Sequence, residues 1–295
     1  FLELPEEVII ATLEVNQRCF ALREKGGGGL LPTFVGVSNT KARNMDVVRR
    51  GYERVVRARL EDAEFYWRQD LKIPIDKMAG RLKEVVYHPR LGTSWEKVER
   101  FRGLAGWLGD ILFPGDGPMR GRVDEAARLC KADLTSGMVG EFPELQGVMG
   151  ERYAERVGFD PTVSRAIFEH YLPRGERDAP PAGDAGALVG LADRMDTLAG
   201  MIGLGYLPSG SEDPFALRRA ANAIIRILLD KGYRLSLAGF AEKALAPLYP
   251  KFKERNEVVH KNLLNFLRNR LSAYFSRGEE SADLVEAILS AQGGL

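Results

Sequence analysis

The sequence has few of the residues from which metal centres and disulfide frameworks are built. Its 295 residues include two cysteines and three histidines. Cys19 and Cys130 are far apart and lack metal-type spacing, so we expect reduced thiols in the core of a cytoplasmic protein. The histidines are too widely spaced for a local zinc motif such as His-Glu-x-x-His; they are His88, His170 and His260. Only a metal site assembled from distant segments remains open.

Long apolar runs, an excess of one charge and the common catalytic loops are also missing. No run approaches the roughly 20 apolar residues that cross a bilayer. The 42 Lys and Arg residues balance 41 Asp and Glu residues, which argues against a wholly basic nucleic-acid binder but leaves room for a local basic face. No Lys-Ser pair follows the glycine run at 26–29, so we interpret this run as a hairpin tip and not as a phosphate loop. The first residues show neither an initiator Met nor a signal pattern, which indicates a piece of a longer chain.

Strand-like and helix-like patterns divide the sequence. Residues 8–15 and 18–23 are rich in β-branched and aromatic residues and predict strands, with a turn at 24–29 and a further strand within 30–40. From Met45 onward, apolar residues recur at helical spacing. Two Asp-Pro pairs mark helix starts, with a capping carboxylate before a first-turn proline; they are Asp160-Pro161 and Asp213-Pro214.

These patterns predict an α+β fold that is predominantly α-helical. We expect a β-hairpin plus a helix over residues 1–80, an all-helical domain over 81–232 and a helical extension over 233–295. Within the extension, residues 256–276 and 281–291 are predicted to form a helical hairpin.

Three aspartates are candidates for a metal site. Asp193 and Asp196 lie one helical turn apart, so they share a side of one helix and are placed to bind a metal with Asp133 and a histidine. In a metal hydrolase, an aspartate placed like Asp133 would usually follow a histidine, and here it follows Ala132. The alternative is that Asp193 and Asp196 pair with Arg194 or with other cations at the domain surface.

The histidines occupy unlike settings. His88 precedes a proline, which predicts an extended segment or a turn. His170 falls at the end of a helix, where its charged form would interact with the helix dipole. His260 belongs to the predicted C-terminal helix, where we expect it to be exposed.

Arginines form two lines at helical spacing. Their planar guanidinium groups suit phosphate contacts. The candidate RNA-binding residues are Arg50, Arg54, Arg57 and Arg59 in the first line, and Arg218, Arg219 and Arg226, with Asn222 between them, in the second. The alternative for the first line is pairing with the acidic segment 60–65.

Several long blocks resemble the β subunit of bacterial glycyl-tRNA synthetase. They include "AARLCKADLTSGMVGEFPELQGVMGERYA" at 126–154, "YHPRLGTSWEKVERFRGLAGWL" at 87–108 and "PSGSEDPFALRRAA" at 208–221. The likeness covers nearly the whole chain in the same order.

This resemblance implies a part in aminoacyl-tRNA synthesis. In that family the α subunit carries the class II ligase core and uses ATP and Mg²⁺, while the β subunit binds tRNA. Residues 1–80 would then be the end of an editing-like region of phenylalanyl-tRNA synthetase type. Residues 81–232 would be an HD-like helical domain, and 233–295 the start of a linker to an absent anticodon-binding domain. The implied partners are glycine tRNA and the α subunit, without DNA or membrane, and this fragment would bind no cofactor itself.

The resemblance also suggests how the aspartates correspond to the metal ligands of HD hydrolases. HD hydrolases bind metal through a histidine, a His-Asp pair and a final aspartate, and Ala132-Asp133 stands in place of the pair. The degenerate HD-like pocket would comprise Ala132, Asp133, His170, Asp193 and Asp196, with His88 as an uncertain match to the first histidine. Losing the imidazole of the pair weakens metal binding, and Lys131 is placed to neutralise Asp133. We therefore predict no catalytic or metal site.

Three functional interpretations stay open at this point. The first is a tRNA-binding, non-catalytic part of the synthetase that uses the arginine lines. The alternative from another class is a metal-dependent HD-type phosphohydrolase using Asp133, His170 and either Asp193 or Asp196. A third treats the fragment as a spacer that holds the anticodon-binding domain in place.

Overall fold

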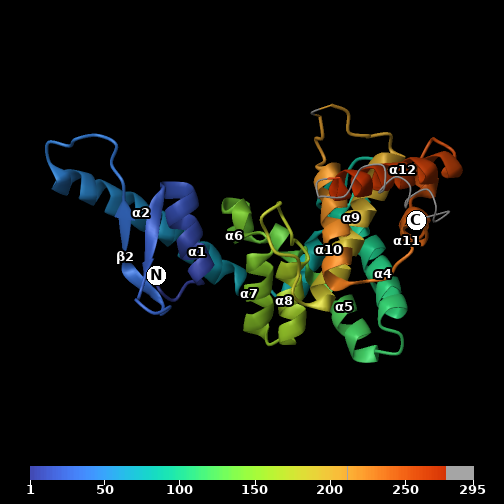
Figure 1. Cartoon of the computed structure of the whole chain (residues 1–295). Coiled ribbons are helices and arrows are strands. Elements are labelled where there is room, and N and C mark those ends of the chain that lie inside the picture. The colour runs from blue at the N-terminus through green and yellow to red at the C-terminus, as the bar shows by residue number, and fades with distance from the viewer. Residues whose placement is uncertain (211, 277–295) are drawn as a thin grey trace.

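A computed structural model describes residues 1–210 and 212–276. Helices make up most of this part of the chain, with two short antiparallel hairpins, so the predicted α+β, mainly helical fold is confirmed. Figure 1 shows an N-terminal unit (residues 1–44) at one side of a larger helical body (residues 75–210 and 212–276). None of the described helices is long and apolar enough to cross a membrane.

The N-terminal unit is partly helical, and one predicted strand is wrong. Residues 8–15 fall in α1 (Glu6–Ile10) and the π-helix η1 (Ala11–Asn16), not in a strand. Consecutive residues Val8 and Ile9 are buried together with Ala11, Thr12 and Leu13, a pattern that a one-sided strand cannot give. Burial against the helices and the strands nearby therefore overrides the β propensity of this segment.

The predicted hairpin is confirmed. Strand β1 (Cys19–Arg23) pairs antiparallel with β2 (Leu30–Gly36), and the glycine run at 26–29 lies in the turn between them. Two strands alone are marginally stable, and the hairpin packs through Cys19 into the same core as α1.

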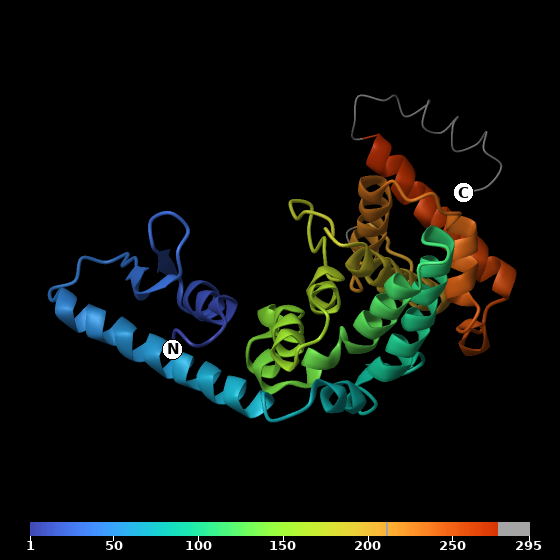
Figure 2. The ribbon, with the colours of Figure 1, turned by 90° about the horizontal axis from the view of Figure 1, so that it is seen from below.

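One long helix joins the N-terminal unit to the helical body. Helix α2 (Met45–Asp70) is capped by Asn44, whose Oδ1 accepts hydrogen bonds from the N–H groups of Asp46 and Val47. Its buried face carries Val56, Leu60 and Ala63. Figure 2 shows α2 as an arm that extends from the body, with the hairpin beside its outer half and α1 beside its inner half, nearer the body.

The helical body surrounds α9 (Asp184–Gly203), a helix that is buried over most of its length. Helices α4 (Ser94–Leu112), α5 (Gly117–Leu129), α8 (Pro161–Glu169) and α10 (Leu217–Lys231) pack against it. The remaining elements are α3 (Ile75–Arg81), β3 (Val86–His88), β4 (Gly92–Thr93), η2 (Ala132–Thr135), α6 (Gly137–Glu141), η3 (Pro143–Leu145), α7 (Val148–Val157), α11 (Leu237–Leu245), η4 (Tyr249–Lys251) and α12 (Asn256–Phe275).

One of the two predicted Asp-Pro helix starts is confirmed. Asp160 caps α8 by accepting a hydrogen bond from the N–H of Thr162 at 2.7 Å. Asp213 also caps a helix, but α10 begins four residues later, at Leu217, whose N–H donates to Asp213 Oδ1 at 2.7 Å. Of the predicted C-terminal hairpin, the first helix is α12, and residues 281–291 lie outside the described part of the chain. The domain limits at residues 80 and 232 stay predictions.

Candidate functional site

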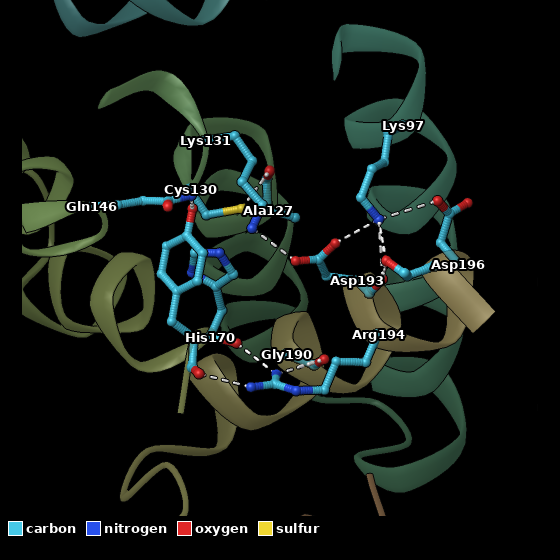
Figure 3. A network of polar contacts seen from close by, with 12 residues as sticks. Lys97, Ala127, Cys130, Lys131, Gln146, His170, Gly190, Asp193, Arg194 and Asp196 are labelled. Carbon is cyan, nitrogen blue, oxygen red and sulfur yellow. Dashed lines mark hydrogen bonds and ion pairs between the residues drawn. The ribbon is translucent and has the colours of Figure 1, made fainter. Parts of the chain in front are cut away.

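The centre of the helical body holds an aspartate between two lysines. Asp193 Oδ1 lies 2.7 Å from the Nζ of Lys97, which comes from α4. Its Oδ2 lies 2.8 Å from the Nζ of Lys131, which follows α5. Figure 3 shows both ammonium groups pointing at this carboxylate. Burial alone would raise the pKa of Asp193, but the two lysines hold it well below its ordinary value.

The negative charge of the neighbouring Asp196 is also compensated by cations. Arg100 binds it with two nitrogens, Nε at 2.7 Å from Oδ1 and Nη2 at 3.1 Å from Oδ2. Lys97 Nζ lies 3.3 Å from Oδ2 of the same carboxylate. Both aspartates therefore pair with cations, as the non-catalytic interpretation of this pair expected. The pairs lie in the interior, however, and not at the surface.

Lys97 stays charged inside the protein. Burial disfavours the ammonium form of Lys97, yet Asp193, Tyr87 and Asp196 raise its pKa above the ordinary value. The Nζ of Lys131 also lies 4.0 Å from the centre of the Tyr171 ring, a cation–π geometry. Two fixed positive charges thus stand where a divalent ion would have to approach Asp193.

Arg194, the predicted partner of the aspartates, points elsewhere. Its guanidinium donates to the backbone carbonyls of His170 and Tyr171, both at 2.7 Å, and of Leu172 at 2.9 Å. These carbonyls follow the C-terminal end of α8, where a helix leaves acceptors unpaired. Arg194 therefore holds the end of α8 and forms no bond to the carboxylates of Asp193 or Asp196 among the described contacts.

Asp133 caps a helix from a distance. Its Oδ2 accepts hydrogen bonds from the N–H groups of Gly147 at 2.6 Å and Gly150 at 3.1 Å, at the start of α7. A Cβ on Gly150 would lie 2.6 Å from Ile167 Cγ2 and 3.3 Å from Asp133 Oδ2, so the close approach depends on glycine. Asp133 itself belongs to the 3₁₀-helix η2 and not to a continuous helix. Burial raises its pKa to about 6 and outweighs the two N–H donors.

His170 is a buried neutral imidazole. Its Nδ1 lies 2.6 Å from the carbonyl oxygen of Ile167. Burial and, less strongly, the charge of Lys131 lower its pKa well below 6.5. His170 does follow the end of α8, but its ring lies in the core and not in solvent, which favours the neutral form.

The other two histidines lie outside this cluster. His88 is in β3, as the extended prediction expected, and its Nδ1 accepts from the N–H of Arg90 at 3.2 Å. His260 lies in α12 but is half-buried and not exposed, with Nε2 3.8 Å from Glu242 Oε2. Helix α11 packs against α12, and the ring's Nε2 also lies 3.5 Å from the carbonyl oxygen of Ala238 in α11.

These contacts do not fit a metal ion. The oxygens of Asp193 and Asp196 face ammonium and guanidinium groups, and the bound oxygen of Asp133 faces backbone N–H groups. Within the described ranges, no group of three or more His, Cys, Asp or Glu residues is arranged to hold one. The cations of this site compensate the buried carboxylates, whose oxygens are therefore not available to hold a metal ion that would activate water.

The arginines of α2 differ sharply from this buried network. Arg50, Arg54 and Arg57 are exposed on the side of α2 away from its buried residues. Over residues 1–210 and 212–276 none of the three forms an ion pair, whereas Arg59 pairs with Glu141 at 2.7 Å. The alternative pairing with the acidic segment 60–65 is not found in the described contacts.

The second arginine line is broken up by internal contacts. Arg226 donates from Nη1 to the carbonyl of Gly175 at 2.9 Å and from Nη2 to that of Asp178 at 2.6 Å, so it fastens the loop between α8 and α9. Arg218 is half-buried and Arg219 is exposed. The guanidinium of Arg226 is thus used within the fold, and RNA binding by this line stays a prediction.

Lys97 and Arg100 were not identified from the sequence as partners of the aspartates, although the position of Lys97 indicated that it would be buried. It falls on the apolar stripe of α4 with Phe101, Leu104 and Leu108, at i, i+4, i+7 and i+11. A lysine on a core stripe predicts a buried acidic partner, because burying an unpaired ammonium is costly. Arg100 lies beside the stripe and has no such signal.

Comparison with known proteins agrees with the resemblance of the sequence blocks. The family described as "Glycyl-tRNA synthetase beta subunit" matches residues 1–290. The chain is 45% identical over 291 residues to the "Glycine--tRNA ligase beta subunit" of Syntrophus aciditrophicus and 46% identical over 290 residues to that of Geotalea daltonii. It is 46% identical over 295 residues to the protein of the same name from Myxococcus xanthus.

These matches cover nearly all of this chain but less than half of each relative. The first two take in 99% and 98% of the chain and 42% of each relative, and the third takes in 98% of the chain and 41% of the relative. The chain therefore spans about two fifths of the length of the curated relatives it matches. On these matches, the chain belongs to the glycyl-tRNA synthetase beta subunit family.

Proposed function

We propose that the chain is a tRNA-binding, non-catalytic segment of a glycine–tRNA ligase β subunit. It would support the attachment of glycine to its tRNA by the α subunit, which would use ATP and Mg²⁺. The proposal is supported by the relatives, which are named glycine–tRNA ligase beta subunit and match this chain over nearly its whole length. The partners would be glycine tRNA and the α subunit.

The geometry of the polar centre favours a non-catalytic role. A hydrolase of HD type would need Asp133 and Asp193 free to bind a metal ion with an imidazole. Asp193 instead lies between the ammonium groups of Lys97 and Lys131, and Asp133 accepts two backbone N–H bonds. We therefore do not propose the phosphohydrolase alternative.

The observation that carries RNA binding is a set of unpaired cations at the outer half of α2. We call this set the cationic tip; its members are Lys41, Arg43, Arg50, Arg54 and Arg57. All five are exposed, and none forms an ion pair within the described part of the chain. Arginines without carboxylate partners can displace counterions from RNA phosphates and donate two hydrogen bonds to one phosphate.

The salt dependence of tRNA binding tests this proposal. The full-length β subunit in complex with its α subunit is compared with the variant Arg50→Gln/Arg54→Gln/Arg57→Gln. Each lost phosphate contact lowers the slope of log Kd against log salt by about 0.7 to 0.9, so we expect a total fall of about 2 to 3.

A matched control removes three arginines that already have carboxylate partners. In the helical body, Arg102 pairs with Asp124 at 2.6 Å, and Arg120 and Arg122 pair with Asp110 and Asp160. The variant Arg102→Gln/Arg120→Gln/Arg122→Gln loses the same charge but should keep the wild-type slope. Equal slopes for both triple variants would remove the cationic tip from the RNA interface.

A further inference from the structure

The last turn of α2 enters the helical body at one buried carboxylate. Asp70 is 3% exposed. Its Oδ1 accepts from the N–H of Gly137 at 2.8 Å, and its Oδ2 accepts from the N–H of Met138 and from the hydroxyl of Tyr153, both at 2.8 Å. The two N–H groups belong to the first turn of α6, where backbone N–H groups have no acceptor within the helix.

Aromatic packing supports this contact. The ring of Trp67, one turn before Asp70, stacks on that of Tyr153 with 5.5 Å between centroids. A Cβ on Gly137 would lie 2.7 Å from Tyr66 Cδ1 and 3.4 Å from Asp70 Oδ1, so the arm approaches closely because residue 137 is glycine. Burial, together with Asp70, raises the pKa of Tyr153, which keeps the phenol protonated as a donor.

The other polar contacts between the arm or N-terminal unit and the body are more exposed. They are Arg59 with Glu141 at 2.7 Å, Asn16 with Glu144 at 2.9 Å, and Arg152 with Glu7. Exposed ion pairs contribute little to stability, whereas a buried carboxylate that loses its donors is strongly destabilised. Among these polar contacts, Asp70 is therefore the one on which the direction of the arm depends most.

Because α2 is long, a small change in its direction at Asp70 displaces the cationic tip by a large distance. Arg54 lies roughly 24 Å from Asp70 along the helix axis at the standard rise per residue. A tilt of about 10° at the base would move Arg54 by about 4 Å, which exceeds the roughly 3 Å of a hydrogen bond. Phosphate contacts by the cationic tip therefore require that the Asp70 end of α2 be held in one orientation on the helical body.

We propose that Asp70 is a positioning residue that fixes the α2 arm on the helical body and so places the cationic tip against RNA. The part of this inference that concerns RNA rests on the proposed function, and the part that concerns the arm does not. The segment from Asp133 to Gly150 then has two structural roles. Its Gly137 and Met138 N–H groups hold the arm through Asp70, and its Gly147 and Gly150 N–H groups hold Asp133 in the core.

The distance between arm and body tests the inference in the full-length β subunit bound to its α subunit. Spin labels are placed at Val47→Cys on α2 and Lys243→Cys on α11, both exposed positions. The native Cys19 and Cys130 are buried and stay unlabelled. Pulsed electron paramagnetic resonance then gives the distribution of the label-to-label distance, and tRNA affinity is measured on the same samples.

Three substitutions separate positioning from a general loss of structure. Asp70→Asn keeps the size but loses the charge and one acceptor, and should broaden the distance distribution and weaken tRNA binding about 3- to 10-fold. Tyr153→Phe removes one donor while keeping the ring on Trp67, and should give a smaller effect of the same kind. Asp62→Asn, an exposed position on the same helix, should leave both measurements unchanged.

The possible results separate this inference from the proposed function. A distance distribution in Asp70→Asn and Tyr153→Phe that is as narrow as in the wild type would overturn the positioning role. A broadened distribution with unchanged tRNA affinity would overturn the claim that the arm is positioned for RNA. If the Arg50→Gln/Arg54→Gln/Arg57→Gln variant also binds normally, it is the proposed function that has failed.

Discussion

Lys97 Nζ lies 2.7 Å from Asp193 Oδ1 in the interior of the helical body. The two residues come from α4 and α9, which are almost a hundred positions apart in the sequence and pack side by side. The same ammonium also reaches Asp196 at 3.3 Å and donates to the hydroxyl of Thr197 at 2.8 Å. A protein cation thus compensates the two carboxylates that the sequence offered as candidates for a metal site.

Replacing Lys97 by Met should destabilise the protein by about 3 to 5 kcal/mol, the cost of breaking a buried ion pair from one side. Asp193 would keep only Lys131 as a cation, and the methionine offers no donor. Urea unfolding followed by circular dichroism measures this free energy. Lys243→Met, at an exposed position on α11, should change it by no more than about 0.5 kcal/mol. Similar free energies of unfolding for the two variants would show that the ion pairs of Lys97 contribute little to stability.

Asp133→Asn should change how stability depends on pH. The pKa of Asp133 is about 6 in the folded protein against 3.8 for the ordinary group, so the folded state binds the extra proton between these values. Wild-type stability therefore loses this contribution as pH rises from about 4 to 6, and the asparagine variant does not.

The free energy of unfolding of Asp133→Asn, minus that of the wild type, should consequently rise by about 2 kcal/mol between pH 4 and pH 7. Taking the difference removes the opposite trend of other carboxylates, such as Asp193, whose pKa is depressed. A difference that does not vary with pH would mean that Asp133 titrates normally.

Gly150→Ala should destabilise the start of α7. The new Cβ would lie 2.6 Å from Ile167 Cγ2 in the core, and overpacking of this kind costs about 1 to 3 kcal/mol. Gly140→Ala is the control, since a Cβ there meets no atom within 4 Å. Thermal unfolding of the two variants compares them, and equal midpoints would show that the helices adjust freely around residue 150.

The sequence predicted the helical character of the body and the hairpin, because long apolar periodicity and turn glycines are local signals. It failed at residues 8–15, where consecutive residues such as Val8 and Ile9 are buried together in a helix although their side chains are β-branched. The candidate aspartates were found, but their partners were not, since the pairing of Asp193 with Lys97 depends on how α4 and α9 pack. Arg226 looked like a surface cation because a sequence does not show that a loop 50 residues earlier folds back onto it.

Arg226→Gln should loosen the loop between α8 and α9 without altering RNA binding. The guanidinium holds the carbonyls of Gly175 and Asp178, so its loss should make trypsin cleave after Arg177 several times faster. Arg219→Gln, at an exposed position on the same helix, should leave the cleavage rate unchanged. Unchanged cleavage in Arg226→Gln, together with a salt slope of tRNA binding lower by about one, would make Arg226 an RNA contact instead.

Site-specific photocrosslinking tests the central claim, RNA contact by the cationic tip, most directly. A benzophenone side chain is placed at Arg54 or at Phe65 of the full-length β subunit, in complex with the α subunit and glycine tRNA. Both positions are exposed on α2, roughly 16 Å apart along its axis. We expect efficient crosslinking to tRNA from position 54 and little from position 65. A complex that binds tRNA at wild-type affinity yet gives no crosslink from position 54 would contradict the account.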